Sequence, residues 1–263
     1  PDAVVEHLLP ALARMLGQAD GSADGRFLAL KLTCDTLLPP LLDPTRDGAG
    51  SGEGGDAAAA AATATTATTR ARLVALLRER LLPLCPPLLA DEDPIPLYAL
   101  KLLGGALEAD REMCAEVVNL GLAPKFFEFL SLEHTNNNVH NVRLCLVLAS
   151  SRAVPMSALC EYGAGRKVAA VLEYAHENAV EPFLEPALGI SRAVLARAAE
   201  ARGRDAGRGG DALAVALDAV APLAALAPVL IECAAAGEAE VTGCAAPQLA
   251  AESLRLATEL LPE

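Results

Sequence analysis

Histidine and cysteine are the side chains of this sequence best suited to hold a metal ion or to act as nucleophiles. Four histidines and seven cysteines occur in 263 residues, and none of them has the CxxC, HxxxH or HExxH spacing of a zinc site. The GxSxG pattern of a serine hydrolase is also absent, and Cys145 lies within an apolar stretch that is typical of a helix core. The sequence therefore predicts no metal, no cofactor and no catalytic nucleophile.

Gly50, Gly52 and Gly55 match the spacing of a phosphate-binding GxGxxG loop. Such a loop follows a β-strand and opens a helix, whereas Leu41-Leu42-Asp43-Pro44 precedes these glycines. The segment is so rich in glycine that the match is expected by chance. The glycines of Gly163–Lys167 lack the length and the hydroxyl of a P-loop, and they are predicted to end one helix and begin the next.

Three basic residues recur between aliphatic neighbours. Lys31 and Lys101 each lie between two leucines, and Arg143 lies between Val142 and Leu144. Equivalent positions of successive repeats line up as a column in a solenoid, so these cations are predicted to bind an acidic segment of a partner protein, such as an acidic tubulin tail. The alternative is that this position faces solvent and accepts any polar residue.

Further arginines gather near residue 200, where a solvated loop explains them as well as binding does. They are Arg192, Arg197, Arg202, Arg204 and Arg208. Asp91 to Asp93 precede Pro94 and are predicted to cap the following helix. Asn136 to Asn138 are predicted to cap turns between helices. Peptide binding of the nuclear-import type is not expected, because that group of armadillo proteins lines its groove with Trp and Asn, and this chain has no Trp.

Similar segments return at a fixed interval along the chain. Lys101 and Arg143 are 42 residues apart, as are Gly121 and Gly163, and armadillo and HEAT repeats have periods of about 40–47 residues. Helices opened by proline alternate with longer apolar helices. Aromatic residues make up only 3% of the chain, so many closely packed helices are favoured over one large core.

Two segments lengthen this interval. Lys31 and Lys101 are 70 residues apart, an excess of 28, and residues 43–70 form a low-complexity insertion of matching length that is rich in Gly, Ala and Thr. Residues 201–210 are predicted to form a second flexible loop, because solenoids tolerate insertions at repeat junctions. Residues 1–263 are therefore predicted to form one all-α solenoid of armadillo/HEAT-like type, with about five repeats of 42 residues and two inserted loops.

The charge of the chain argues against two classes of partner. With 34 acidic and 21 basic residues the net charge is -13, and phosphate binding needs clustered Lys and Arg, so nucleic acid is not expected. The most apolar stretch, Ala219–Ile231, contains two prolines and is shorter than the roughly 20 residues that span a bilayer, so no membrane is expected.

The cysteines are odd in number and widely spaced, which is typical of free thiols in a reducing compartment. They are Cys34, Cys85, Cys114, Cys145, Cys160, Cys233 and Cys244. A cytoplasmic location is therefore expected. The chain begins at Pro1 rather than Met, and it is expected to be part of a longer protein.

Four segments between about residues 91 and 199 are longer and more specific than the repeat pattern requires. They are Asp93–Leu103, Phe126–Leu132, Asn137–Ser150 and Phe183–Val194. In these segments the chain resembles the C-terminal repeat region of the Fused-like protein kinases. That family joins an N-terminal kinase or pseudokinase domain to a long armadillo-like tail, and it is linked to microtubules, in plants to the cytokinetic array and in animals to motile cilia.

The resemblance implies a non-catalytic interaction scaffold. The kinase motifs Val-Ala-Ile-Lys, His-Arg-Asp and Asp-Phe-Gly are absent, so this chain is not expected to be an enzyme, and any kinase or pseudokinase domain would lie outside it. The expected partners are proteins of a microtubule or axonemal assembly, and the expected location is the cytoskeleton, at the axoneme of a cilium or flagellum. The alternative is a cargo- or peptide-binding armadillo adaptor unrelated to kinases.

Overall fold

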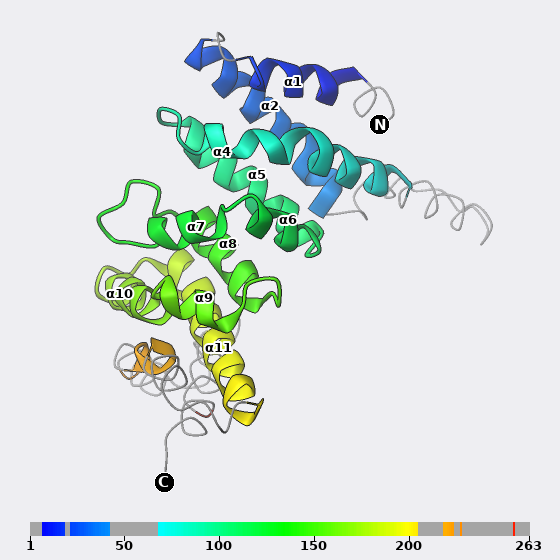
Figure 1. The fold of residues 1–263 in the computed structure, drawn as a ribbon. Helices are drawn as coiled ribbons and strands as arrows, with labels where there is room; N and C mark the ends of the chain where they lie inside the picture. The colour runs from blue at the N-terminus through cyan, green and yellow to red at the C-terminus, as the bar shows by residue number, and fades with distance from the viewer. Residues whose placement is uncertain are drawn as a thin grey trace, which may run out of the picture. The chain divides into compact units, whose positions relative to one another are not determined.

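The computed structural model describes residues 7–18, 22–42, 68–204 and 218–223, together with Ala227 and Arg255. All regular elements within these ranges are helical (Figure 1), which confirms the all-α solenoid class. Contacts divide the chain into two compact units, Pro1–Leu120 and Gly121–Glu263. Each unit is described by itself.

The first unit alternates shorter helical segments with long helices. Its elements are α1 (Leu9–Leu16), α2 (Ala23–Leu42), a helix over residues 68–76, the π-helical turn η3 (Leu77–Leu81), the 3-10 turn η4 (Leu82–Leu84), α4 (Cys85–Leu88), α5 (Ile95–Ala109) and α6 (Met113–Asn119). The α1 helix packs on α2, and α4 packs on α5.

Prolines open several of these segments. Pro10 in this unit and Pro124 in the second unit each lie in a first helical turn, as the sequence predicts, because a missing N–H costs nothing there. Pro83 opens η4 but follows the helical residues 68–81 without a break. This position of Pro83 explains why the preceding helix loosens into the π-helical turn Leu77–Leu81. A proline ring clashes with the carbonyl four residues earlier, and a wider turn relieves that clash.

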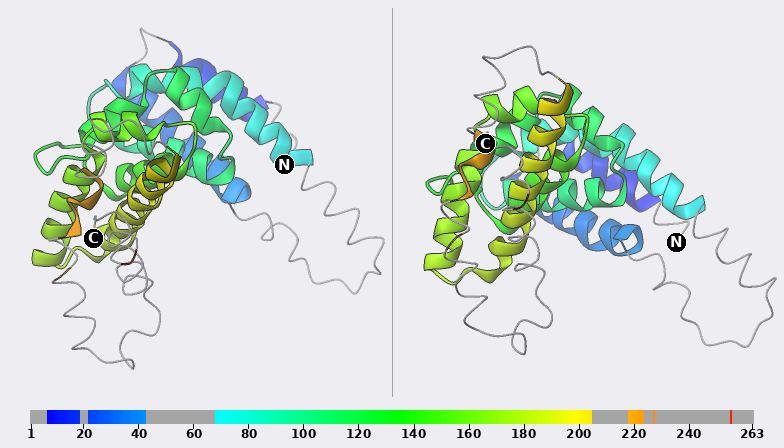
Figure 2. Two further views of the ribbon diagram at one scale, coloured as in Figure 1. Left: turned by 60° about the horizontal axis from the view of Figure 1, so that its bottom comes forward. Right: turned by 90° about the horizontal axis from the view of Figure 1, so that it is seen from below.

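The long helices α2 and α5 pack side by side (Figure 1 and Figure 2). A side chain at Gly105 would place its Cβ 2.5 Å from Cδ2 of Leu38, so glycine permits this close approach. Toward the start of both helices the rings of Phe27 and Tyr98 meet edge to face, with centroids 5.3 Å apart. Because both contacts advance in the same direction along the two helices, α2 and α5 run parallel.

An ion pair fixes the turn before α5 to α2. Arg26 donates from Nε to Oδ2 of Asp91 at 2.8 Å and from Nη2 to Oδ1 at 2.9 Å. The expectation that Asp91 caps α5 is wrong, since the N-cap of α5 is Pro94 and no side chain caps it. Asp91 pairs with Arg26 instead, because a guanidinium donates two parallel hydrogen bonds to a carboxylate, whereas a backbone N–H donates one.

The predicted insertion 43–70 lies mostly outside the described residues. Its last three residues, 68–70, are helical and continue into the helix that ends at residue 76. Arg70 donates from Nη2 to the carbonyl oxygen of Ala109 at 2.8 Å, at the last residue of α5. This contact joins residue 70 to the packed helices, so the insertion ends earlier than the composition of the segment suggests.

The second unit contains α7 (Ala123–Phe129), α8 (Val139–Ser150), α9 (Met156–Glu161), α10 (Ala164–Glu177), α11 (Glu181–Arg204) and the segment 218–223. The α11 helix packs on α8, α9 and α10. The long helices α5, α8 and α11 begin at residues 95, 139 and 181, at intervals of 44 and 42 residues. Their starts therefore follow the predicted repeat.

Two predicted caps are confirmed in this unit. The side chain of Asn138 accepts the backbone N–H groups of His140 at 3.0 Å and of Asn141 at 3.2 Å, which starts α8. Gly163 separates α9 from α10 with φ of +66°, a left-handed conformation in which glycine has no Cβ penalty. Both residues set where a helix begins.

The packing of α11 on α8 repeats the glycine contact of the first unit. A Cβ at Gly189 would lie 2.9 Å from Cδ1 of Leu146. Gly189 follows Gly105 by 84 residues, which is two periods of 42. The same place in the repeat therefore permits close helix packing in both units.

The predicted second loop begins later than its sequence suggests. Residues 201–204 are helical, because α11 continues to Arg204, and residues 205–210 lie outside the described part of the chain. Alanine and arginine are strong helix formers, so Ala201, Arg202 and Arg204 extend a helix that is already formed, and a single Gly203 does not end it.

A buried carboxylate starts α10. Asp218 is 5% exposed, and its Oδ2 accepts the backbone N–H of Gly165 at 2.9 Å. Its Oδ1 lies 3.4 Å from Nε of Arg166. A carboxylate at a helix N-terminus is stabilised by the free N–H groups and by the helix dipole, so segment 218–223 is held against α10.

We predict that Asp91→Asn lowers the melting temperature at neutral pH by a few degrees. The hydrogen bonds from Arg26 hold the pKa of Asp91 below its ordinary value. Because the folded pKa is lowered, this stabilisation is present above the unfolded pKa and is lost as the pH falls through the folded value. Thermal unfolding from pH 7 to pH 3 should show the difference from wild type shrinking below about pH 4; a difference that does not change with pH would contradict the ion pair.

Asp218→Ala is predicted to lower the free energy of unfolding by about 1–2 kcal/mol, because the first N–H groups of α10 lose their acceptor. Gly165→Ala should cost more, since the added Cβ would lie 1.7 Å from the carbonyl oxygen of Asp218. Urea unfolding measures both changes. The exposed Glu161 offers a matched control, and Glu161→Ala should change stability by less than about 0.5 kcal/mol. Equal effects of Asp218→Ala and Glu161→Ala would refute the capping role.

Candidate protein-binding surface

Lys31 and Lys101 lie on the two packed long helices of the first unit. Lys31 is exposed on α2. Lys101 lies on α5, where its side chain is 37% exposed and its Nζ is 3.8 Å from Oδ1 of Asp35 on α2. The same Nζ lies 5.7 Å from the centroid of the Tyr98 ring. The two lysines therefore belong to one surface of the first unit, and one of them is partly neutralised by a neighbouring carboxylate.

Arg143 is exposed on α8 in the second unit. Its neighbours Val142 and Leu144 are fully buried, as expected for a polar residue on the outer side of a packed helix. Arg143 belongs to a different unit from the two lysines. The alignment of the three cations in one column therefore stays a prediction.

Apolar side chains surround the two lysines. Leu28 and Leu32 lie one helical turn apart on α2 and are 53% and 43% exposed, and Leu97 on α5 is 36% exposed. We call the surface formed by Leu28, Lys31, Leu32 and Asp35 of α2 with Leu97 and Lys101 of α5 the α2–α5 face. Of this face, only the lysines were predicted from the sequence. The four-residue spacing of Leu28 and Leu32 could have indicated that apolar residues share the face.

The arginines near residue 200 divide between structure and surface. Arg197 donates from Nη1 to the carbonyl oxygens of Ala149 at 2.9 Å and Ser151 at 3.0 Å, and from Nη2 to that of Val154. It therefore binds the C-terminal end of α8, where unpaired carbonyls attract a cation. Arg192 is exposed on α11. The side chains of Arg202, Arg204 and Arg208 lie outside the described part of the structure.

Polar side chains also donate hydrogen bonds to the last carbonyl groups of α7, which was not predicted from the sequence. Lys167 donates from Nζ to the carbonyl oxygen of Phe127 at 2.7 Å, and Asn141 donates from Nδ2 to that of Phe126 at 3.1 Å. Both carbonyls belong to the last turns of α7. Contacts between residues 15 and 40 positions apart leave no local pattern, so only the folded chain identifies them.

Burial disfavours the thiolate form of three cysteines. Burial raises the pKa of the Cys34 and Cys85 thiols to about 12, and it raises the pKa of Cys145 as well. At neutral pH these thiols stay protonated, and a protonated thiol is a poor nucleophile. The prediction that Cys145 is a core residue is confirmed, since it is fully buried. Cys233 and Cys244 lie outside the described residues.

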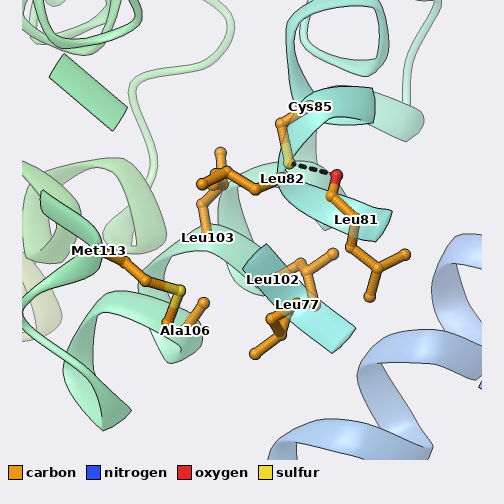
Figure 3. Close-up of a pocket in the computed structure, with 8 residues that line it drawn as sticks. All are labelled: Leu77, Leu81, Leu82, Cys85, Leu102, Leu103, Ala106 and Met113. Carbon is orange, nitrogen blue, oxygen red and sulfur yellow. Dashed lines mark hydrogen bonds between the residues drawn. The ribbon is translucent and has the colours of Figure 1, made fainter. Parts of the chain in front are cut away.

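A small cavity in the first unit is lined entirely by apolar side chains and one thiol (Figure 3). Its volume is about 10 Å³, which is at the lower limit for one water molecule. The thiol of Cys85 donates to the carbonyl oxygen of Leu81 at 3.4 Å, and both residues belong to the wall of the cavity. Catalysis needs several converging polar groups, and this cavity supplies none.

No group of three or more His, Cys, Asp or Glu side chains within the described residues is placed to hold a metal ion. None of the helices in this part of the chain is both long and apolar enough to cross a membrane.

We predict that Arg197→Met lowers the free energy of unfolding by about 2–3 kcal/mol. The carbonyl groups of Ala149 at the end of α8, and of Ser151 and Val154 just after it, would lose their charged hydrogen-bond donor. Methionine keeps most of the aliphatic stem, so the loss reports the guanidinium. Chemical denaturation measures it. Arg192→Met on the same helix is the control, and comparable losses from the two substitutions would contradict the specific role of Arg197.

Comparison with known proteins gives two adjacent matches. The family "Serine/threonine-protein kinase ULK4-like, HEAT repeats" matches residues 1–115, and the family "RUNKEL ARM-repeat domain" matches residues 122–246. Both are families of repeats, and neither is a kinase domain. No solved structure matches the chain.

Two curated relatives agree with these families. The chain is 33% identical over 195 residues to the serine/threonine-protein kinase RUNKEL of Arabidopsis thaliana, a match that covers 74% of this chain and 13% of that protein. It is 29% identical over 138 residues to the serine/threonine-protein kinase ULK4 of Mus musculus, covering 52% of this chain and 9% of the relative. The matched region is thus a small part of each relative, and an adaptor unrelated to kinases is not supported. The two adjacent family matches and the two curated relatives show that this chain is an armadillo/HEAT repeat region of the ULK4/RUNKEL type of protein kinase.

Proposed function

We propose that this chain is a non-catalytic scaffold that binds other proteins, and that it docks on microtubule-associated or axonemal proteins. The observation that carries the proposal is that both family matches fall on repeat regions of one kinase type. Repeat regions stack helices into extended surfaces that generally bind proteins. The α2–α5 face has the exposed leucines and lysines that such binding requires.

Two further features support a binding role over a catalytic one. The cavity shown in Figure 3 is too small and too apolar to hold a substrate. The buried thiols Cys34, Cys85 and Cys145 are protonated at neutral pH because burial raises their pKa. We propose that any kinase or pseudokinase domain of the parent protein lies outside this chain, as the names of the relatives suggest.

The microtubule part of the proposal rests on the resemblance to Fused-like kinases and on charge. Lys31, Lys101 and Arg143 are cations on an acidic chain of net charge -13, and they are accessible on α2, α5 and α8. Acidic segments, such as tubulin tails, are the complementary partners. The proposed location is the cytoplasm, on the cytoskeleton, at the axoneme of a cilium or flagellum.

Charge reversal tests this function. The triple variant Lys31→Glu, Lys101→Glu and Arg143→Glu is expected to weaken co-sedimentation with microtubules or with isolated axonemes by about tenfold or more, because three attractions become repulsions. The fold should persist, since surface substitutions rarely cost more than about 0.5 kcal/mol. Circular dichroism and thermal unfolding check that it does.

Arg111→Glu is the matched control, because Arg111 is exposed in the turn before α6 and is not one of the proposed contacts. It should leave co-sedimentation unchanged. If the wild-type chain binds neither microtubules nor axonemes at micromolar concentration, the microtubule function fails. If it binds and the triple variant binds equally well, the three cations are not the contact.

A further inference from the structure

The first two helix pairs of the chain share short sequence motifs in the same order. The first pair is α1 with α2, and the second is the helical segment 68–88 with α5. Leu-Leu-Pro occurs at residues 8–10 and again at 81–83, and Ala-Leu-Lys-Leu occurs at 29–32 and again at 99–102. Residues at these offsets of 73 and 70 positions therefore occupy equivalent places in the two pairs.

Equivalent apolar residues are exposed in the first pair and buried in the second. Leu8, at the start of α1, is 41% exposed, whereas its equivalent Leu81 is 1% exposed. Met15 of α1 is 45% exposed, whereas its equivalent Leu88 is 3% exposed. The same places in the repeat are covered in one pair and open in the other.

In the second pair, Leu81 and Leu88 lie on the side of their segment that faces α1. A Cβ at Gly17, directly after α1, would lie 3.5 Å from Cδ2 of Leu84, and α1 also packs on η3. Leu84 lies three residues after Leu81 and four before Leu88, and residues at these spacings share one side of a helix. The preceding helix thus meets the side on which these leucines are buried.

The equivalent stripe of α1 consists of Leu8, Ala11 and Met15, which have the same spacing and carry no charge. Met15 precedes Gly17 by two residues, which is about 200° around a helix, so the stripe points away from the second pair. The α1 helix lies at the end of the first unit opposite to α6 (Figure 1). The side of α1 that corresponds to a contact with a preceding helix is therefore apolar and exposed.

The long helix of the first pair shows the same contrast. Leu32 of α2 is 43% exposed, whereas its equivalent Leu102 of α5 is 1% exposed. Leu28 is 53% exposed, and its equivalent Tyr98 packs its ring against Phe27 of α2. The place that α5 uses for contact with the preceding long helix is therefore open on α2.

Charged residues lie around this surface. Asp24 and Lys31 are exposed on α2, and the Asp35 carboxylate lies 3.8 Å from a lysine ammonium of α5. Interfaces commonly keep charged groups at a solvated rim around an apolar centre. Thr36 needs no outside partner, because its hydroxyl donates to the carbonyl oxygen of Leu32 at 2.6 Å. The uncharged stripe of α1 is therefore expected to form the centre of the contact.

We propose that a further helix pair of the same repeat type packs on the outer face of the first pair. This outer face is formed by Leu8, Ala11 and Met15 of α1 with Leu28 and Leu32 of α2, and it shares the last two residues with the α2–α5 face. The α1–α2 pair is then an inner repeat of a longer stack, since a terminal repeat carries a polar outer side.

The stacking of the described pairs defines this occupant. Its long helix places an apolar side chain against Leu28, as α2 places Phe27 against Tyr98. The parent protein is its source, because the curated relatives extend far beyond the matched region, which is 13% and 9% of their length. The proposal concerns how the scaffold is built, so it goes beyond the proposed docking function.

Two chains test the proposal: residues 1–263, and the same chain extended upstream by about 90 residues of the parent sequence, or about two repeats. Hydrogen exchange followed by mass spectrometry measures the protection of α1. Its amides should exchange at least about tenfold more slowly in the longer chain, because packing suppresses local opening, whereas α8 should exchange equally in both. Equal exchange of α1 in the two chains, or a parent without a helical repeat upstream, would overturn the proposal.

The double variant Leu8→Gln, Met15→Gln identifies the contact. In the longer chain it should restore fast exchange of α1 and lower the melting temperature by several degrees. In residues 1–263 it should shift the melting temperature by less than about 2 °C, because both side chains are already partly exposed there. Leu132→Gln, at a leucine that is 46% exposed in the second unit, is the control and should have no effect in either chain. Equal losses in both chains would refute the stacking role.

A second copy of the chain is the competing occupant of the outer face. Sedimentation velocity measures self-association of both chains. Any dimer of residues 1–263 that forms through this face should disappear in the longer chain, because the preceding pair covers the face there. A dimer that persists in the longer chain and dissociates in the double variant would assign the face to a second copy and overturn the proposal. None of these outcomes depends on binding to microtubules or axonemes.

Discussion

Close packing of long helices is the constraint on which both units depend. Gly105 of α5 faces Leu38 of α2, and Gly189 of α11 faces Leu146 of α8, so closely that an added Cβ would require the leucine side chain to shift. A repeat helix cannot bury its apolar side alone, so stacking on the next repeat provides its core. The two glycines are 84 residues apart, and the position that permits this stacking therefore recurs with the repeat.

Stacked helices leave carbonyl groups unpaired at their ends, and the protein satisfies several of them with side chains from distant segments. Arg70 binds the end of α5, Lys167 that of α7, and Arg197 that of α8. Asp218 has the reverse role at the start of α10. These contacts tie successive helices of a unit together, and they use basic residues that would otherwise look available for a partner.

Lys31 and Lys101 differ from those basic residues in their surroundings. They stand among exposed leucines on the outer side of packed helices, where no helix end requires a cation. A surface that combines apolar exposure with charge gives a partner both a desolvated contact and a preferred orientation. Binding on such a surface is compatible with the protonated thiols and the small apolar cavity, which are features of a packed core rather than of a catalytic centre.

The sequence by itself determined the helical class, the 42-residue repeat, the proline and asparagine positions that start helices, and the core position of Cys145. These features are local or periodic, and the chemistry of a single turn or a single helix face specifies them. Only the tertiary structure decided that Asp91 pairs with Arg26, that Arg197 binds the end of α8, and that Leu28, Leu32 and Leu97 share a face with the lysines. Each of these depends on which helices lie side by side, and contacts between residues tens of positions apart have no signature in a single sequence.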